Sequence, residues 1–146
     1  MALRVIDHNT PEYEQMIRLR LDILRKPLGL DFSPEELERE KDDILIAAFE
    51  DDEILGCCLL TNTEPGTVRL RQMAVPGNMQ RKGIGRQMIQ FAENVARDYG
   101  YKKITMHARD TAIGFYEKMG YKLQGGEFLE VSLPHHVMEK MLDNKF

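Results

Sequence analysis

The sequence predicts a mixed α/β fold in which helices cover both faces of a central sheet. Three observations support this class. Seven short runs have the character of strands. Four other segments repeat apolar residues at helical spacing or carry helix-start residues, and turn residues separate the two kinds of segment. The resulting order is β-α-α-β-β-β-α-β-α-β-β.

The chain is expected to open with a strand at residues 2–7 and a helix that begins after Thr10. Thr10 is a good N-cap, and Pro11 suits the first helical position because its missing N–H would have no intrahelical partner. Pro27 stops this helix, and residues 33–40 begin with Ser-Pro-Glu-Glu, which starts a second helix. The apolar face of the first helix is predicted at Tyr13, Ile17, Leu21 and Leu24.

Turn residues define the rest of the chain. An acidic turn at residues 51–53 joins two strands into a hairpin, and Gly100 and Gly120 end the last two helices. These helices follow the glycine-bearing turn near residue 83 and the strand at 103–108. The six remaining strands are expected at 44–50, 54–61, 67–75, 103–108, 128–133 and 136–142.

Residues 80–85, Gln-Arg-Lys-Gly-Ile-Gly, form the most informative turn because they join a strand to a helix. The first N–H groups of a helix have no intrahelical partner, and the helix dipole adds partial positive charge there. Gly83 and Gly85 let an anion approach this backbone without meeting a Cβ atom. The turn is therefore predicted to hold a pyrophosphate.

Three glycine-rich motifs are candidates for this turn. A P-loop requires Gly-Lys followed by serine or threonine, which the sequence lacks. The dinucleotide fingerprint requires a third glycine where Met88 stands. The remaining pattern, [Gln/Arg]-x-x-Gly-x-[Gly/Ala], is filled by Gln80, Gly83 and Gly85. It resembles the coenzyme A loop of the GNAT superfamily of N-acetyltransferases.

A second segment strengthens this resemblance. Residues 112–121, Ala-Ile-Gly-Phe-Tyr-Glu-Lys-Met-Gly-Tyr, are similar to the superfamily's later Ala-Ile-x-Phe-Tyr-x-Lys-x-Gly-[Phe/Tyr] segment, and they follow a strand-like run as in the family. The resemblance implies a GNAT-like fold with a mostly antiparallel central sheet. It also implies transfer of an acetyl group from acetyl-CoA to a primary amine of a small molecule or peptide, by direct attack in a ternary complex.

The resemblance also implies coenzyme-binding residues. In the family, the backbone before the loop pairs with the pantetheine arm like an added strand, which corresponds here to Met73, Ala74 and Val75. Arg109 lies at a strand–helix junction where the family often has an asparagine that contacts the coenzyme. Arg81 stands where the family often has glycine, and we expect it to face ligand or solvent. The pyrophosphate is expected to contact Gln80, Arg81, Lys82, Gly83, Ile84, Gly85 and Arg86.

Acetyl transfer needs a proton donor for the departing thiolate and a base for the amine. The resemblance places Tyr116 nearest the coenzyme's sulfur, and its phenol, protonated at neutral pH, can donate to a thiolate. A core tyrosine is the alternative, and Phe115 beside it is expected in the core. The base is left open among Glu130, His135, His136, His107 and a water-relayed group.

The C-terminal tail narrows this choice. Residues 128–138 resemble a subgroup of small predicted acyltransferases whose members carry an acidic residue, then a hydrophobic-Pro-His turn, then a methionine. This resemblance favours His135, together with Glu130, as site residues. A structural histidine in a strand turn is the alternative.

The sequence does not define the acceptor. Arg18, Arg20 and Arg25 lie on the first helix, which borders the acceptor cleft in the superfamily. We expect a solvated helix face there; an exposed positive patch would instead favour anionic small molecules. Residues 28–32 are a candidate apolar lid over the cleft.

Length and composition limit other functions. The 146 residues are enough for a single domain, 1–146. The formal net charge of −4 gives no basic surface for nucleic acid, and no apolar run approaches the length of a membrane span. Adjacent Cys57 and Cys58 favour two small core residues over a disulfide or a metal site. We therefore expect a cytoplasmic protein without a metal, as a monomer or homodimer.

Two other functions stay open. One is a non-catalytic coenzyme A sensor, which would keep the glycine loop and lack turnover. The other is an α/β domain that binds a partner and no coenzyme. Tyr116 favours an enzyme over a sensor, because a sensor needs no positioned acid.

Overall fold

The computed structural model describes residues 1–79 and 82–143. It divides into two compact units, one made of residues 1–61 and 71–92 and the other of residues 62–70 and those from 93 onward. The single domain expected over residues 1–146 stays a prediction. None of the helices in the described ranges combines the length and the apolar character needed to cross a membrane.

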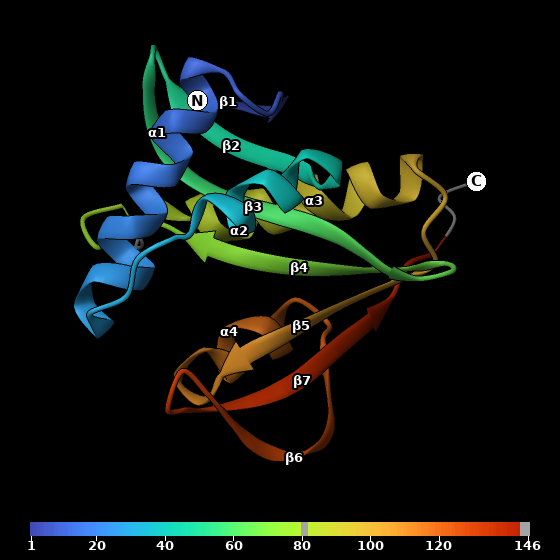
Figure 1. Cartoon of the computed structure of the whole chain (residues 1–146). Helices are drawn as coiled ribbons and strands as arrows, with labels where there is room; N and C mark the ends of the chain where they lie inside the picture. The colour runs from blue at the N-terminus through green and yellow to red at the C-terminus, as the bar shows by residue number, and fades with distance from the viewer. Residues whose placement is uncertain (80–81, 144–146) are drawn as a thin grey trace. The chain divides into compact units, whose positions relative to one another are not determined.

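The order of the elements is the predicted one (Figure 1). The strands follow the sheet order β1-β2-β3-β4-β5-β7-β6, with β4 and β5 parallel and a mostly antiparallel arrangement otherwise. This confirms the mixed α/β fold. The elements are β1 (Ala2–Ile6), α1 (Pro11–Arg20), α2 (Pro34–Arg39), β2 (Ile44–Glu50), β3 (Glu53–Glu64), β4 (Thr67–Ala74), α3 (Ile84–Asp98), β5 (Lys103–Arg109), α4 (Ile113–Lys118), β6 (Lys122–Glu130) and β7 (Leu133–Met141).

Helices cover both faces of the sheet in the first unit. Strand β2 is apolar over most of its length, and adjacent residues of a strand point to opposite faces. Leu45 belongs to the core cluster that contains Met16 of α1, whereas Ala48 belongs to the cluster that contains Met88 of α3. Figure 1 shows α1 on one side of β2 and β3, and α3 on the other. The continuous apolar run of β2 therefore contributes to two cores.

Helix α1 and the turn after it bury part of the predicted stripe and two further residues. Tyr13 is buried, and Ile17 and Leu24 pack against the same core cluster. Met16 and Arg20 are fully buried, whereas Ile17 and Leu21 are only half-buried. The predicted stripe was incomplete for two reasons. It counted only apolar positions, although Arg20 occupies a core position. The chain also leaves α-helical geometry in a π-helical turn at Leu21–Arg25, which changes the face that later residues present.

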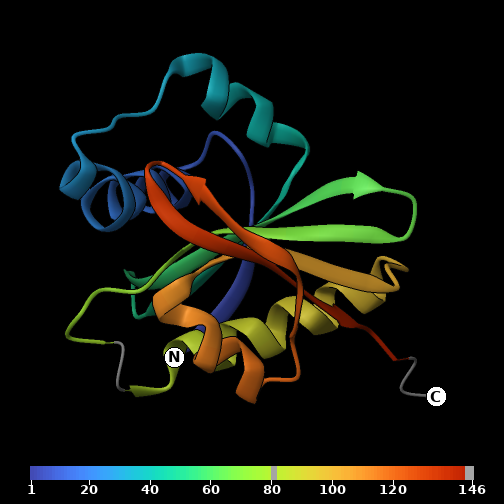
Figure 2. The same ribbon diagram turned by 90° about the horizontal axis from the view of Figure 1, so that it is seen from below.

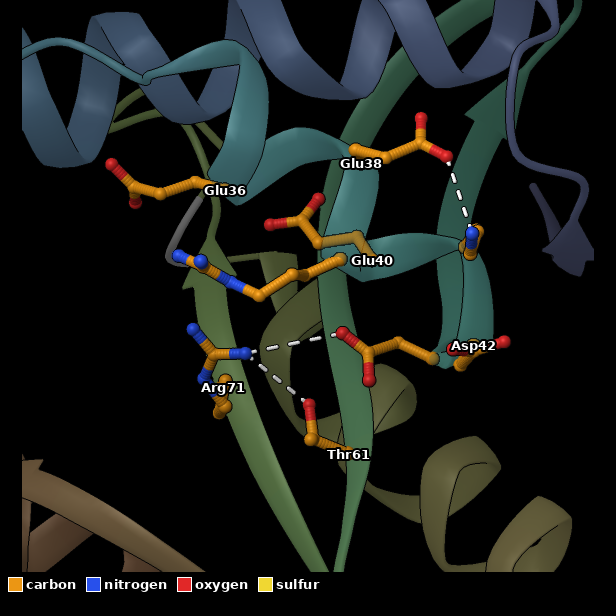
Figure 3. Close-up of a pocket in the computed structure, with 9 residues that line it drawn as sticks. Glu36, Glu38, Glu40, Asp42, Thr61 and Arg71 are labelled. Atoms are coloured by element: carbon orange, nitrogen blue, oxygen red, sulfur yellow. Dashed lines mark hydrogen bonds and ion pairs between the residues drawn. The ribbon is translucent and has the colours of Figure 1, made fainter.

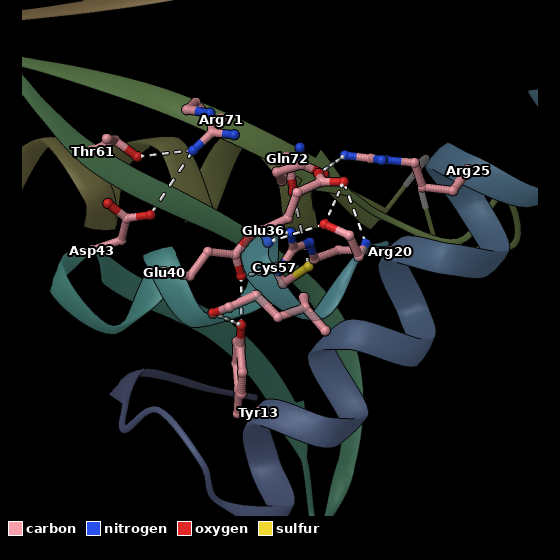
Figure 4. A network of polar contacts seen from close by, with 12 residues as sticks. Tyr13, Arg20, Arg25, Glu36, Glu40, Asp43, Cys57, Thr61, Arg71 and Gln72 are labelled. Carbon is pink, nitrogen blue, oxygen red and sulfur yellow. Dashed lines mark hydrogen bonds and ion pairs between the residues drawn. The ribbon is translucent and has the colours of Figure 1, made fainter. Parts of the chain in front are cut away.

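Glu40, in the short 3₁₀ turn after α2, neutralises Arg20 inside the core. Arg20 donates from Nη1 to Oε1 at 2.8 Å and from Nη2 to Oε2 at 2.6 Å, and the Tyr13 hydroxyl donates to Oε1 at 2.6 Å (Figure 4). Burial raises the pKa of Tyr13, and Glu40 raises it further, so the phenol keeps its proton. Two-point contact and a third donor offset the cost of burying both charges. The network fixes α1 to the segment before β2.

Replacing Tyr13 with phenylalanine is expected to lower the free energy of unfolding by about 1 to 3 kcal/mol. The ring packing would remain, but the buried carboxylate of Glu40 would lose a donor. Urea denaturation measures the change. Tyr101→Phe, at a half-buried tyrosine, is the matched control, with an expected change within about 0.5 kcal/mol. Equal stability of the Tyr13 variant and the wild type would show that this bond adds nothing net.

The second unit is built on β5, β6 and β7. Strand β5 pairs with one edge of β7 and β6 pairs with the other, both antiparallel. Figure 2 shows β5, α4 and the β6–β7 hairpin in orange to red. The buried Tyr121 donates to Glu93 Oε2 at 2.8 Å, and Lys140 Nζ donates to Glu93 Oε1 at 3.1 Å. These bonds join Glu93 of α3 to the residue before β6 and to β7.

The β6–β7 hairpin turns earlier than predicted. The sequence placed the break at Pro134, but Pro134 is the second residue of β7. The turn residues are Val131 and Ser132, whose φ angles of 46° and 64° are both left-handed. Asparagine and glycine usually occupy such positions, so residue type did not reveal the turn. A β-branched residue in this conformation carries backbone strain.

Candidate functional site

The predicted phosphate-binding turn leads into the N-terminus of α3. Gly83 has a φ of 76°, a left-handed conformation that glycine adopts without strain. Among the described residues other than its two chain neighbours, no heavy atom lies within 4 Å of the position that a Cβ atom would take there. Helix α3 begins at Ile84, and the Gln87 N–H donates to the Gly83 carbonyl at 3.1 Å. The N–H groups of residues 84–86 therefore belong to the part of the first turn that has no intrahelical acceptor.

Side chains around this turn divide into exposed and buried ones. Lys82 and Arg86 are exposed, so both cations are free to approach an anion at the turn. Ile84 is 4% exposed and packs in the core, so only its backbone is available to a ligand. Gln80 and Arg81, two predicted pyrophosphate contacts, lie outside the described residues.

Strand β4 has an irregular backbone immediately before the predicted pantetheine-pairing residues. Gln72 has a φ of 56°, which is uncommon for a residue other than glycine. Its carbonyl lies 3.9 Å from the Cys57 Sγ atom. Ala74 and Val75 are buried, and Met73 packs against the same core as Val75. A ligand at this stretch would therefore meet backbone rather than side chains.

Tyr116 lies in α4, as predicted, and is 8% exposed. The rings of Phe115 and Tyr121 pack edge-on against it, with centroid distances of 5.1 and 5.9 Å. Phe115 is 41% exposed, so the expectation that it is a core residue was wrong. Neighbouring residues of a helix point in different directions, and in this short helix the tyrosine takes the inward one.

Three of the four candidate bases meet on neighbouring strands of the second unit. Glu130 ends β6, and its Oε1 atom lies 2.9 Å from Nδ1 of His107 in β5. Its Oε2 atom lies 3.7 Å from Nε2 of His135 in β7. Arg69 in β4 completes the cluster, with its Nη2 atom 2.8 Å from His107 Nδ1 and 3.7 Å from Glu130 Oε1. His136 points to the opposite face of β7, because neighbouring strand residues alternate.

Arg69 is the residue of this cluster that the sequence analysis did not assign to the site. Val68 and Leu70 on either side are buried, so Arg69 points to the other face of β4. This alternation could have been read from the sequence. It places the cation of Arg69 on the face of β4 opposite to the buried Val68 and Leu70. Arg109, a predicted coenzyme contact, is exposed at the end of β5 and opposes His135 in the register with β7.

The hydrogen bond of His135 defines its tautomer. Its Nδ1 atom lies 2.8 Å from the Leu133 carbonyl oxygen, which can only accept, so Nδ1 carries the proton. Nε2 of the neutral ring then holds the lone pair. Burial acts to raise the pKa of Glu130, but His107, Arg69 and His135 lower it below its usual value. Glu130 is thus a weaker base and a persistent negative charge, which favours His135 as the proton acceptor.

A pocket of about 490 Å³ lies in the first unit, beside α2 and the turn that follows it (Figure 3). Arg71 of β4 forms one wall, where its Nη1 atom donates to Thr61 Oγ1 at 3.3 Å and lies 3.9 Å from Asp43 Oδ2. Burial raises the pKa of Asp43, and the nearby Arg71 opposes this rise. The lining residues are Glu36, Glu38, Arg39, Glu40, Lys41, Asp42, Asp43, Thr61 and Arg71.

The arginines of the first helix do not form the exposed positive patch considered from the sequence. Arg20 is fully buried and paired with Glu40. The Arg25 Nη2 atom lies 3.2 Å from Glu36 Oε2, and of the three only Arg18 is exposed. The expected solvated helix face was therefore wrong for Arg20, which is a core residue. These arginines therefore do not support a preference for anionic acceptors.

The candidate lid at residues 28–32 is apolar but mostly unpacked. Leu28 and Leu30 are exposed. Phe32 instead packs against two guanidinium groups, with its ring centre 4.6 Å from Arg20 Cζ and 4.1 Å from Arg25 Cζ. Phe32 thus anchors the segment to the end of α1.

Cys57 and Cys58 are free and fully buried, as predicted. Burial raises the pKa of both thiols. In the described ranges, no group of three or more His, Cys, Asp and Glu side chains is arranged to hold a metal ion.

The chain matches the family model described as "Acetyltransferase (GNAT) domain" over residues 28–142. It is 33% identical over 87 residues to "Probable N-acetyltransferase 14" of Xenopus tropicalis, in a match that covers 57% of this chain and 42% of that protein. It is 31% identical over 97 residues to "Uncharacterized N-acetyltransferase YvbK" of Bacillus subtilis (strain 168), with 64% and 61% coverage. These matches thus span about two fifths to three fifths of the relatives' own length.

A solved structure shares the fold over nearly the whole chain. The aminoglycoside 6'-N-acetyltransferase complexed with coenzyme A superposes with a TM-score of 0.82 and 20% identity, and the match covers 99% of both chains. At this identity the likeness is one of fold. The family model covers most of the chain, including β4, the turn before α3, α4 and the β6–β7 hairpin. The chain belongs to the GNAT acetyltransferase domain family.

Proposed function

We propose that this protein is an acetyl-CoA-dependent N-acetyltransferase, which moves an acetyl group to a primary amine of a small molecule or peptide. The observation that carries the proposal is the left-handed, sterically open Gly83 at the N-terminus of α3, in a chain that belongs to a family of acetyltransferase domains. Such a helix start offers unpaired N–H groups and a favourable dipole to a phosphate group.

In this proposal, the coenzyme binds mainly to backbone. The N–H groups of residues 84–86 hold the pyrophosphate, with Lys82 and Arg86 adding positive charge. The backbone of Met73, Ala74 and Val75 pairs with the pantetheine arm. Gln80, Arg81 and Arg109 keep their assignment as coenzyme contacts from the sequence.

The chemistry requires two proton transfers. The neutral amine attacks the thioester carbonyl carbon, and the new C–N bond gives a tetrahedral oxyanion. His135 accepts the amine proton at Nε2, while Glu130 stabilises the imidazolium that forms. The intermediate collapses with cleavage of the C–S bond, and the Tyr116 hydroxyl protonates the departing thiolate. Solvent then returns a proton to Tyr116 and removes one from His135.

The pocket beside α2 is the candidate place for the acceptor. Its lining has five carboxylate side chains and three cationic ones, so its charge does not favour an anionic acceptor. The proposal also assigns the protein to the subgroup with a C-terminal Pro-His turn and to the cytoplasm. It further describes a monomer or homodimer that binds neither nucleic acid nor membrane.

Acetyl-CoA is expected to raise the melting temperature of the purified protein. Ligand at 100 times its Kd stabilises the folded state by about 2.7 kcal/mol, which is several degrees for a domain of this size. The control is adenosine with acetate, which lacks the pyrophosphate and pantetheine. No shift at saturating acetyl-CoA would overturn the proposal. A shift without thiol release in a screen of amines would indicate the sensor alternative.

A further inference from the structure

Two histidines compete for the Glu130 carboxylate. One oxygen lies 2.9 Å from Nδ1 of His107, and the other lies 3.7 Å from Nε2 of His135. If the Glu130 carboxylate is hydrogen-bonded to His107, it stabilises a positive charge on His135 less. The share that reaches His135 therefore depends on what occupies Nδ1 of His107.

Two neighbours lie within hydrogen-bonding distance of Nδ1 of His107, and only one of them can be bonded to it at a time. The Arg69 guanidinium, 2.8 Å away, is always protonated and can only donate. The Glu130 carboxylate, 2.9 Å away, can only accept when it is charged. If Nδ1 carries a proton, it can donate to Glu130 but must face an N–H of Arg69. If Nδ1 carries a lone pair, it accepts from Arg69.

The surroundings of the His107 ring favour the lone pair. The positive charge of Arg69, at hydrogen-bonding distance from Nδ1, opposes a proton at that atom. The Arg69 Nη2 atom also lies 3.7 Å from Glu130 Oε1, so the same charge offsets the repulsion between the carboxylate and the lone pair. The edge-on Phe128 ring, 5.2 Å from the imidazole centre, adds packing without a competing hydrogen bond.

We propose that Arg69 is a positioning residue that holds neutral His107 with its proton on Nε2, and thereby leaves the charge of Glu130 to His135. Arg69 and Glu130 then form a cation–carboxylate pair beside His107, and Oε2 of Glu130 faces the imidazole of His135. With the lone pair on Nδ1, His107 no longer donates to Glu130, so the positive charge of Arg69 keeps the pKa of this carboxyl low. The neutral rings of the two histidines have opposite tautomers, because His135 keeps its proton on Nδ1 through the Leu133 carbonyl. The support of His135 as a base rests on the proposed acetyl transfer. The assignment of the two tautomers does not depend on that proposal.

The tautomers can be measured without turnover. Long-range proton–nitrogen correlation spectra of ¹⁵N-labelled protein at pH 8 distinguish a protonated ring nitrogen from one with a lone pair. The chain has four histidines, and single His→Gln variants assign their signals. We expect His107 with a proton on Nε2 and His135 with a proton on Nδ1 in the same spectrum. A proton on Nδ1 of His107 in the wild type would overturn the proposal.

Removal of the Arg69 donor should switch the tautomer. In Arg69→Met, we expect the proton of His107 to move to Nδ1, where it donates to Glu130, and we expect kcat to fall about tenfold as His135 loses support. Arg69→Lys, which keeps a charged donor, should retain the Nε2 proton and recover most of the rate. An unchanged tautomer in Arg69→Met would also overturn the proposal. If Arg69→Met does not fold, the His107 tautomer in the wild type and in Arg69→Lys still tests the proposal.

The two proposals fail in different ways. A wild-type protein without turnover, but with the expected tautomers, would contradict the proposed function and leave the role of Arg69 on the His107 ring intact. A wild-type enzyme with the opposite His107 tautomer would contradict the role of Arg69 and leave the acetyltransferase intact.

Discussion

Replacing Tyr116 with phenylalanine is expected to lower kcat by about 10² to 10⁴, the usual range for loss of a positioned general acid. The change removes one hydroxyl and keeps the ring, so the edge-on contacts with Phe115 and Tyr121 should survive. Coenzyme affinity should barely change, because the proposed phosphate and pantetheine contacts come from other residues. The loss should appear equally in kcat and in kcat/KM, which marks an interaction made only in the transition state.

Tyr99→Phe is the matched control for this prediction. Tyr99 is 64% exposed, and loss of its hydroxyl should leave turnover unchanged. The assay is release of coenzyme A with a primary amine found by the acceptor screen. A Tyr116→Phe enzyme with near-normal kcat would mean that solvent or another group protonates the sulfur. Tyr116 would then be a packing residue.

Replacing Gly83 with glutamate is expected to raise the Kd for acetyl-CoA by about 10² or more. Juxtaposition of like charges costs several kcal/mol, and the new carboxylate would occupy the space proposed for the pyrophosphate. In the part of the chain that the structure describes, no heavy atom beyond the two chain neighbours lies within 4 Å of the new Cβ position, so the fold should persist. Calorimetric titration with acetyl-CoA measures the change.

Gly83→Ala separates charge from backbone conformation. Both variants place a Cβ atom at a φ of 76°, which costs about 1 to 2 kcal/mol in a residue other than glycine. Alanine adds this strain without the negative charge, so it should lower stability slightly and keep most of the affinity. Wild-type affinity in Gly83→Glu would show that the phosphate site lies elsewhere.

The sequence was most informative where a function depends on neighbouring residues. The turn at residues 82–85 and the segment around Tyr116 are both local, because a glycine, a helix start and the strand before it follow one another along the chain. Spacing therefore located both the start of α3 and the position of α4 correctly. Strand alternation likewise argued against a disulfide between the two cysteines, and both are free and buried.

The buried charge and the cluster of candidate bases were missed because both depend on contacts between distant segments. Arg20 can take a core position only because Glu40 and Tyr13 meet it there, and no periodicity rule anticipates a buried charge. The cluster of Arg69, His107 and Glu130 depends on strand register, which composition does not encode. The candidate bases could therefore be predicted from the sequence, whereas the contacts among them could not.

The burial of Cys57 and Cys58 has a practical consequence for enzymology. These are the two cysteines of the chain, and both thiols are fully buried with pKa values raised by burial. Aromatic disulfide reagents attack thiolates, so the folded enzyme should stay colourless in them while free coenzyme A reacts at once. The background of a continuous colorimetric assay should then be flat. Two equivalents of colour should appear only after guanidinium is added, so the same reagent reports both turnover and unfolding.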